Sequence, residues 1–455
     1  MLTGCQGKFD YTFCRAIISL LNQRAKITFD PLTNACMQRK LQGHCAGSAN
    51  NTYGKSAQKE LAVLRLIHRK NNVSRVELVE LTGFSAGLIT GITQSLIRKR
   101  LITETPGHTS AAGRRPIALS VRHDAAYVVG VDLGSFYLRV VVTDLHGKLL
   151  QKLQTETSLS EGRERVLERT FTAVRRAIKE CGIPRDKIGG IGMAHSGIID
   201  SAAGVVLSYP RPGQMTEWKN VPLRRMLEQE FAAPCILEDS VRAIAVAERC
   251  FGTETNLDDF VYVDVGMGIG AGIFLNGNLY EGFGGGAGEF GHMTVQENGP
   301  LCCCGNSGCL EMMASCGAII HAARSAIERG VDSRIRELVG GKLQSISIEV
   351  ITQASQENDS LAFRVLHEAV SHIGVALADV VNLLNPRVVV FGGPLFRAAP
   401  YLLESLKRVL KQRALERSAN QVQLMVSNLG NEAGALGAAR VMSEKVIEAL
   451  FKEAC

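Results

Sequence analysis

The sequence lacks the features that mark several classes of protein. Among its 455 residues there is no uninterrupted apolar run near the roughly 18–20 residues that a membrane-spanning helix requires. The apolar stretch 16–21 is too short for a signal-peptide core and directly follows Arg15. With 46% hydrophobic and 21% charged residues, the composition excludes a collagen, a coiled coil and a chain that is disordered throughout. We therefore expect a cytoplasmic globular protein with about two or three domains and no membrane partner.

Acidic residues are scarce in the first quarter of the chain. Residues 1–123 carry 18 Lys and Arg against 6 Asp and Glu, whereas residues 124–455 carry 33 against 38. The positive excess of the whole chain, +7, therefore lies in the first quarter. Part of it belongs to residues 1–56, which are weakly periodic and which we expect to form a poorly ordered extension. The division of charge predicts an N-terminal module that faces a polyanion, joined to a separate body.

Residues 57–105 have the periodicity of three helices. The second helix begins with Ser74-Arg75-Val76-Glu77, which has the pattern of a capping box. A turn that contains Gly83 follows, and Ser85 is suited to cap the third helix. A short helix, a glycine-containing turn and a further helix are typical of a helix-turn-helix, whose second helix enters the major groove of DNA. The alternative is a three-helix bundle with no role in DNA binding.

The third helix has an apolar face and a polar face. Its apolar face carries Leu88, Ile89, Ile92 and Leu96. Small, polar or basic residues lie on the opposite face, and with the capping Ser85 they are the predicted DNA contacts: Gly87, Thr90, Gln94 and Arg98. Side chains of these types reach base edges and phosphates without steric conflict.

A basic segment follows the helices. We predict a wing strand over 102–105 and assign residues 106–124 to a linker that contains Gly113-Arg114-Arg115-Pro116. Extended arginines suit the narrow minor groove, where the negative potential is concentrated. Arg114 and Arg115 are therefore predicted DNA contacts, and a plain basic linker is the alternative.

A strand, an Asp-x-Gly turn and a second strand occur twice in the body. The first turn is Val131-Asp132-Leu133-Gly134 and the second is Val263-Asp264-Val265-Gly266. Backbone N–H groups at such turns can form an anion-binding nest. The repeat predicts a duplicated α/β fold with lobes over 125–250 and 251–455 and a ligand cleft between them. We expect the C-terminal helix to return to the first lobe.

Four cysteines fall within eight residues, in a chain whose thiols should be mostly reduced in the cytoplasm. His292, Cys302, Cys304 and Cys309 form a Cys₃His set of the kind that binds zinc in a closed tetrahedron. Because four protein ligands leave no open position, we expect a structural zinc ion, with Cys303 pointing away from it. The alternative is a cluster that holds no metal.

The segment Gly288-Glu289-Phe290-Gly291-His292, with Cys302-x-Cys304-Gly305-x-x-Gly308-Cys309-x-Glu311 after it, resembles the signature of the ROK family. That family (repressor, open reading frame, kinase) contains bacterial sugar kinases and repressors that respond to glucose, xylose or N-acetylglucosamine. The resemblance covers about residues 57–445, and the helix-turn-helix resembles the repressor branch. It implies a winged helix-turn-helix followed by a two-lobed actin-like body. The sugar-binding residues that it implies are Gly197, Glu238, Asp239, Glu289, His292 and Glu311.

The turns that bind ATP phosphates in the family's kinases differ here. Asp239 matches the kinases' general base, and Glu238 replaces an Asn, so that two carboxylates adjoin and either pKa could be raised. Phe136 and Met267 stand where the kinases have Thr, and Pro394 lacks an N–H. We therefore interpret the phosphate turns as vestigial and expect no kinase activity. The residues of these turns are Asp132, Gly134, Gly266 and Gly268.

Together these observations predict a sugar-responsive transcriptional regulator, most simply a repressor of carbohydrate uptake or catabolism genes. Its expected partners are a double-stranded DNA operator, a sugar effector and a second copy of the chain, in a homodimer or homotetramer. One alternative is an ATP-dependent sugar kinase with an accessory DNA-binding domain, in which Asp239 is catalytic. Another is a regulator controlled by a protein partner, with a vestigial sugar pocket.

Overall fold

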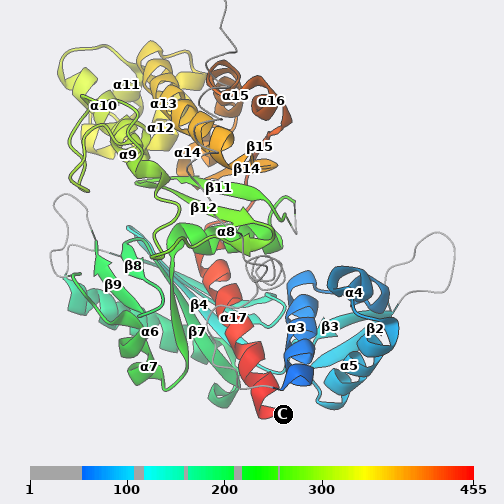
Figure 1. The fold of residues 1–455 in the computed structure, drawn as a ribbon. Coiled ribbons are helices and arrows are strands. Elements are labelled where there is room, and N and C mark those ends of the chain that lie inside the picture. The colour runs from blue at the N-terminus through cyan, green and yellow to red at the C-terminus, as the bar shows by residue number, and fades with distance from the viewer. Residues whose placement is uncertain (1–53, 107–116, 158–161, 210–217, 255–256) are drawn as a thin grey trace, which may run out of the picture. The chain divides into compact units, whose positions relative to one another are not determined.

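A computed structural model of the chain describes residues 54–106, 117–157, 162–209, 218–254 and 257–455 (Figure 1). By their contacts, residues 59–455 form one compact unit. Apart from 54–56, the extension expected at 1–56 lies outside the described residues, and so do Arg114 and Arg115.

The N-terminal domain is a winged helix-turn-helix. Its elements are α3 (Lys55–Lys70), β1 (Val73–Ser74), α4 (Arg75–Thr82), α5 (Ala86–Arg98), β2 (Ile102–Pro106) and β3 (Ile117–Val121). The Ser74 hydroxyl accepts from the Glu77 N–H, and the Glu77 carboxylate accepts from the Ser74 N–H, which confirms the capping box. Gly83 ends α4 at a φ of 67°, in the left-handed region.

The wing differs from its prediction. Residues 117–121, predicted as part of a linker, instead form β3, which pairs antiparallel with both β1 and β2. The strand has buried side chains at four of its five positions. Its partners come from two other parts of the chain, and local periodicity does not reveal such pairing.

The body contains two five-stranded sheets with the same strand order. The first sheet comprises β4 (Tyr127–Leu133), β5 (Tyr137–Asp144), β6 (Leu149–Glu156), β7 (Ile188–His195) and β10 (Cys235–Asp239). The second comprises β11 (Phe260–Val265), β12 (Ile269–Leu275), β13 (Asn278–Leu279), β14 (Val388–Gly392) and β15 (Gln423–Val426). In each sheet the first strand is central, antiparallel to the second and parallel to the fourth. The structure thus has the duplication that the two Asp-x-Gly turns predict.

The helices pack on these sheets. The first lobe also contains α6 (Arg163–Cys181), the β8 (Ile198–Asp200) to β9 (Val205–Ser208) hairpin, α7 (Leu223–Phe231) and α8 (Ser240–Phe251). The second lobe contains α9 (Leu310–Ala314), α10 (Cys316–Glu328), α11 (Arg334–Leu338), α12 (Ile348–Gln356), α13 (Ser360–Leu384), α14 (Gly393–Ala398), α15 (Leu402–Arg413) and α16 (Glu416–Gln421). Helix α13 is long and apolar enough to span a bilayer, although polar residues interrupt it. Most of its apolar window is buried, because α13 is a core helix of the second lobe.

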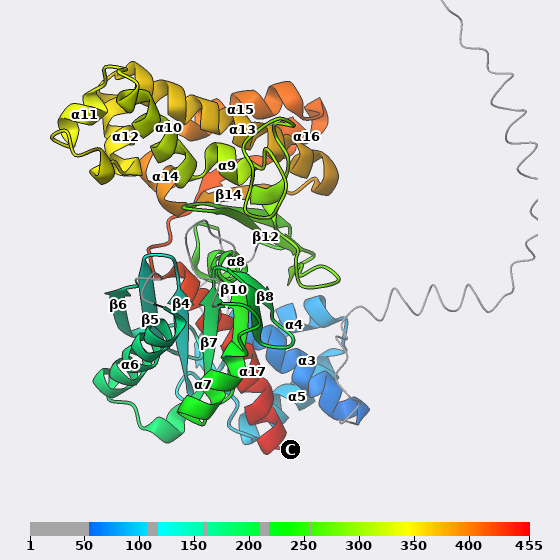
Figure 2. The same cartoon turned by 90° about the vertical axis from the view of Figure 1, so that its left-hand side faces the viewer.

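The last helix, α17 (Ala433–Glu453), leaves the second lobe and packs on β4 and β7 of the first (Figures 1 and 2). Its backbone lies directly on these strands. A side chain at Gly130 would overlap the carbonyl oxygen of Ala435, and one at Gly192 would overlap that of Ala438. Such close contact is available only to glycine, so α17 and the first sheet form one tightly packed body.

Candidate functional site

A cavity of about 930 Å³ lies between the lobes, and both lobes contribute to its wall. The two Asp-x-Gly turns, the first turn of α8, segment 285–289 and the start of α17 all reach it. Five of the six predicted sugar-binding residues line it: Gly197, Asp239, Glu289, His292 and Glu311. The carboxyl ends of β4, β10 and β11 open on this cavity, as is usual for ligand sites of α/β folds.

Asp239 is held by the start of α8. Its Oδ1 accepts from the N–H groups of Val241 at 2.9 Å and Arg242 at 3.0 Å, which fixes the orientation of the carboxylate. Burial raises the pKa of Asp239, and the nearby Glu289 carboxylate adds to this effect. The residue is therefore a fixed acceptor in the cavity wall whose affinity for a proton is increased.

Glu238 is the exception among the predicted sugar-binding residues, because its side chain does not reach the cavity wall. It is buried, and its Oε1 accepts from the Nε of Arg242 at 2.8 Å and from the N–H of Asp239 at 2.8 Å. The expected perturbation of the adjacent carboxyls is present, since the pKa of both is raised, but its main cause is burial.

Arg242 lines the cavity and was not among the predicted site residues. Besides binding Glu238, its guanidinium donates to the Gly285 carbonyl oxygen and, over 3.1 Å, to the Ser201 hydroxyl. It thereby ties the second-lobe segment near Gly285 to the first lobe. The signal in the sequence is an arginine four residues after Glu238, close enough along the chain to pair with a buried carboxylate.

The Cys₃His set is assembled in one loop. The ligand atoms of His292, Cys302, Cys304 and Cys309 all lie within 4.8 Å of one another. The Cys304 and Cys309 sulfurs are 3.7 Å apart, and the His292 Nδ1 is 3.6 Å from the Cys302 sulfur. Zinc bonds are about 2.3 Å to sulfur and about 2.0–2.1 Å to nitrogen. In a tetrahedron, two sulfur ligands therefore lie about 3.8 Å apart, and a sulfur and a nitrogen ligand lie about 3.6 Å apart. The donor set therefore fits zinc.

Cys303 is not a member of this set of four and is exposed to solvent. Its sulfur lies 4.0 Å from that of Cys302, and the residue lines the cavity between the lobes. The His292 ring turns Nδ1 toward the thiols, and its Nε2 lies 3.8 Å from the Glu289 carboxylate. The imidazole thus joins the thiol cluster to the cavity wall.

Glu311 both lines the cavity and supports it. Its Oε2 accepts from the N–H of Ile269 at 2.9 Å, which attaches the start of α9 to the start of β12. The loop around Gly197 is equally constrained. A Cβ at Gly197 would lie 2.7 Å from the Ser208 carbonyl oxygen, and the Gly197 N–H donates to the Nδ1 of His195. His195 is a core residue that packs against Trp218, and burial lowers its pKa to about 4.

The two Asp-x-Gly turns lie at the cavity with their predicted substitutions. Asp132, Gly134, Gly266 and Gly268 all line it. Burial raises the pKa of Asp132 to about 6, and the nearby Asp264 and Asp239 carboxylates contribute in the same direction. The side chains of Phe136 and Met267, which stand where the family's kinases have Thr, are exposed in the cavity wall.

On α5, the predicted polar face is exposed: Gly87, Thr90, Gln94 and Arg98. Ile89, Ile92 and Leu96 are buried, whereas Leu88, predicted on the apolar face, is 37% exposed. The Ser85 hydroxyl accepts from the Leu88 N–H, and the Thr90 hydroxyl donates to the Ala86 carbonyl. DNA contact by these residues stays a prediction.

Three comparisons with known proteins agree with one another. The model of the ROK family matches residues 128–445. A putative xylose repressor from Caldicellulosiruptor sp. (strain Rt8B.4) is 31% identical over 378 residues, which cover 83% of this chain and 93% of that protein.

Two solved structures are also similar. The crystal structure of a ROK family transcriptional regulator, a homologue of the Escherichia coli MLC protein, matches with a TM-score of 0.72 and 27% identity over 88% of this chain and 98% of that one. A ROK family glucokinase from Streptomyces griseus, solved with glucose and AMPPNP, matches with a TM-score of 0.61 and 27% identity, over 70% of this chain and 99% of its own.

Proposed function

The chain belongs to the ROK family, and from this premise we propose that it is a sugar-responsive repressor of carbohydrate uptake or catabolism genes. The single observation that carries the proposal is the capped helix α5, which presents Thr90, Gln94 and Arg98 to solvent ahead of a two-lobed actin-like body. A sugar kinase needs no such helix. In support, a protein named as a putative xylose repressor is similar to this chain over 93% of its own length.

DNA binding is assigned to the exposed face of α5 and to the basic segment after β2. A homodimer or homotetramer places two recognition helices in successive major grooves of a palindromic operator. Gly87 permits close approach of the helix to DNA, Thr90 and Gln94 read base edges, and Arg98 and Ser85 contact the backbone. Arg114 and Arg115 enter the minor groove.

The sugar effector is assigned to the cavity between the lobes. Asp239, Glu289 and Glu311 accept hydrogen bonds from vicinal hydroxyls, and Gly197 lets the loop backbone approach the ring. His292, Cys302, Cys304 and Cys309 hold a structural zinc ion, which fixes the ring of His292. The Nε2 of His292 is then free to bind a hydroxyl group of the sugar.

The test is a gel shift on the DNA upstream of the protein's own coding sequence, with glucose, xylose, N-acetylglucosamine and their phosphates added in turn. We expect specific binding of the upstream DNA and release by one of these compounds. Release by a protein extract combined with no heat on titration of any sugar would instead support control by a protein partner. Failure to bind any site in that DNA would contradict the assignment to α5.

A kinase remains the second candidate because Asp239 retains the position and raised pKa of a general base. The exposed Phe136 and Met267 in the phosphate turns favour the regulator, since they offer no donors to phosphate oxygens. ATP-dependent phosphorylation of a sugar by the purified chain, lost in Asp239→Asn, would establish the kinase.

A further inference from the structure

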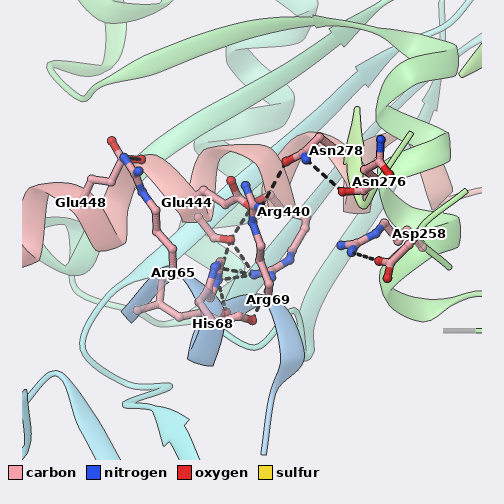
Figure 3. A network of polar contacts seen from close by, with 12 residues as sticks. Arg65, His68, Arg69, Asp258, Asn276, Asn278, Arg440, Glu444 and Glu448 are labelled. Atoms are coloured by element: carbon pink, nitrogen blue, oxygen red, sulfur yellow. Dashed lines mark hydrogen bonds and ion pairs between the residues drawn. The ribbon is translucent and has the colours of Figure 1, made fainter. Parts of the chain in front are cut away.

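Helix α3 of the DNA-binding domain is joined to α17 through a buried hub, in which His68 meets Arg440 (Figure 3). Ser443 of α17 is the third residue of this hub. The Arg440 guanidinium donates to the His68 carbonyl oxygen at 2.8 Å and contacts both ring nitrogens. The Ser443 hydroxyl lies 3.1 Å from the His68 Nε2, which is 3.2 Å from the Leu145 carbonyl oxygen. Burial, together with Arg440, lowers the pKa of His68 well below its usual value, which favours the neutral ring.

Two ion pairs on the same helix flank the hub. Arg65 binds Glu448 at 2.8 Å, and Arg69 binds Glu444 at 3.3 Å. Both acidic partners belong to α17, which packs on the first sheet. The hub and the ion pairs therefore dock the DNA-binding domain on the first lobe.

Arg69 also reaches the second lobe. Its Nη1 donates to the Oδ1 of Asn278 over 3.5 Å, at an exposed position (Figure 3). Asn278 is the first residue of β13 and follows a turn that is held in place, since the Asn276 N–H donates to Asp259 and the Gly277 N–H donates to the Asp258 carbonyl. Asn278 is thus a rigid point of the second lobe.

The strand that leads to this turn begins at the sugar cavity. β12 runs from Ile269, whose N–H donates to Glu311, to Leu275, next to the turn. An extended strand of this length spans about 20 Å and does not change its length. A movement of the second lobe at Glu311 must therefore also move Asn278.

We propose that Arg69 and Asn278 form a latch that is closed in one arrangement of the lobes and open in the other. This inference rests on the proposed function. The hub is buried and stays intact, whereas a long, exposed hydrogen bond breaks after a small displacement. The latch makes the orientation of the DNA-binding domain depend on the position of the second lobe, and hence on the sugar. Arg69 and Asn278 are positioning residues that touch neither ligand.

The latch has a signature that a merely structural contact lacks. Asn278→Ala removes the acceptor and depopulates the closed latch, whereas Asn278→Asp adds a charge opposite Arg69 and populates it. Because the latch favours one lobe arrangement, the two substitutions should move sugar affinity in opposite directions, each by about two- to fivefold, the effect of a modest hydrogen bond. Operator affinity should shift reciprocally.

The experiment is calorimetric titration of the full chain with glucose, xylose, N-acetylglucosamine and their phosphates, without DNA, for the wild type and six variants. Asn278→Ala and Asn278→Asp should shift the Kd in opposite directions. In an Arg69→Gln background both shifts should vanish. Arg65→Gln, which removes a neighbouring ion pair to the same helix α17 without reaching the second lobe, is the matched control and should leave the Kd unchanged.

Two kinds of failure are distinguishable. Wild-type sugar binding with an unchanged Kd in both Asn278 variants, or shifts that persist without Arg69, would overturn the latch alone. If the wild-type chain binds none of these sugars and none of their phosphates, the proposed function fails and the latch fails with it. Gel shifts of the same variants provide the reciprocal check, and equal changes in operator affinity for Asn278→Ala and Asn278→Asp would also overturn the latch.

Discussion

The two lobes have the same strand order but carry different attachments. The first lobe holds the DNA-binding domain, through the buried hub of His68 and Arg440 and the ion pairs beside it. The second lobe has a long insertion, residues 280–387, between its third and fourth strands, and this contains the Cys₃His loop and helices α9 to α13. In the first lobe the corresponding segment, 157–187, contains α6 as its one long helix among the described residues.

This difference shows how a duplicated fold can separate two tasks. One copy gives the DNA-binding domain a rigid support, and the other supplies most of the residues proposed to bind sugar. The cavity lies where the two copies meet, so a ligand that contacts both lobes also sets the angle between them. Outside the latch of Arg69 and Asn278, substitutions that affect one lobe should therefore change mainly one task.

The largest expected effect belongs to the second lobe. Cys304→Ser removes one ligand of the proposed zinc site and should lower the free energy of unfolding by roughly 3 kcal/mol or more, since structural zinc contributes about 10–16 kcal/mol in small sites. Sugar binding should be lost because His292 loses its anchor. Calorimetry with metal analysis measures both, and Cys303→Ser, in the same loop, is the control that should match the wild type in stability and metal content. Intact sugar affinity in zinc-free protein would contradict the link.

The next largest loss of stability is expected at the buried hub that holds the DNA-binding domain on the first lobe. His68→Ala leaves the buried Arg440 without its ring acceptor and should lower the free energy of unfolding by about 2–3 kcal/mol. Operator affinity should fall to the same extent with and without sugar, since the support itself is damaged. Denaturant unfolding and gel shifts measure the two effects. A change confined to the sugar-bound form would show that the hub takes part in switching.

The DNA-binding domain can be tested apart from both lobes. Gln94→Ala should relax the preference for one base pair in each half-site by about 1–3 kcal/mol and leave sugar affinity unchanged. Arg114→Gln should instead weaken binding to all sequences and reduce the dependence on salt. Binding measured on a set of operator variants at two salt concentrations distinguishes the two. Unchanged operator affinity in both variants would contradict the DNA-reading assignment.

The last prediction concerns pH and the first lobe. His195 has a folded-state pKa of about 4, below the value near 6.5 of an unfolded chain, so between these values the unfolded state binds the extra proton. Stability should therefore decline as the pH falls from 6.5 to 4, with a contribution of at most about 1.4 kcal/mol per pH unit from this residue. His195→Asn should reduce that slope in denaturant unfolding measured across the window. The same slope in the wild type and in His195→Asn would show that His195 does not cause the loss of stability at low pH.

Much of the site could be predicted because its signals are local. The repeat of Asp132 and Asp264 indicated two lobes with a cleft between them, and the spacing of His292 and the three cysteines indicated the thiol cluster. Other features depend on contacts between distant segments. His68 and Arg440 are separated by 372 residues, and no periodicity relates them.

Two departures of the structure from the predicted pattern have a common physical cause. Glu238 was assigned to sugar by its place beside Asp239, but alternate residues of a strand face opposite sides, and Arg242 neutralises its carboxylate inside the protein. The strand over 117–121 was missed because its pairing partners lie elsewhere in the chain. In both cases the decisive partner is set by tertiary structure.

The glycines beneath α17 restrict how descendants of this sequence can diverge. At most tightly packed positions, a larger residue on one side can be accommodated by a smaller one on the other. Such compensation cannot occur at Gly130 and Gly192. A side chain there would overlap the main-chain carbonyl oxygens of Ala435 and Ala438, and every residue has a carbonyl oxygen. Paired substitutions cannot relieve the overlap there, so the cavity can adapt to a new effector and α5 to a new operator, while the contact between the strands and α17 stays fixed.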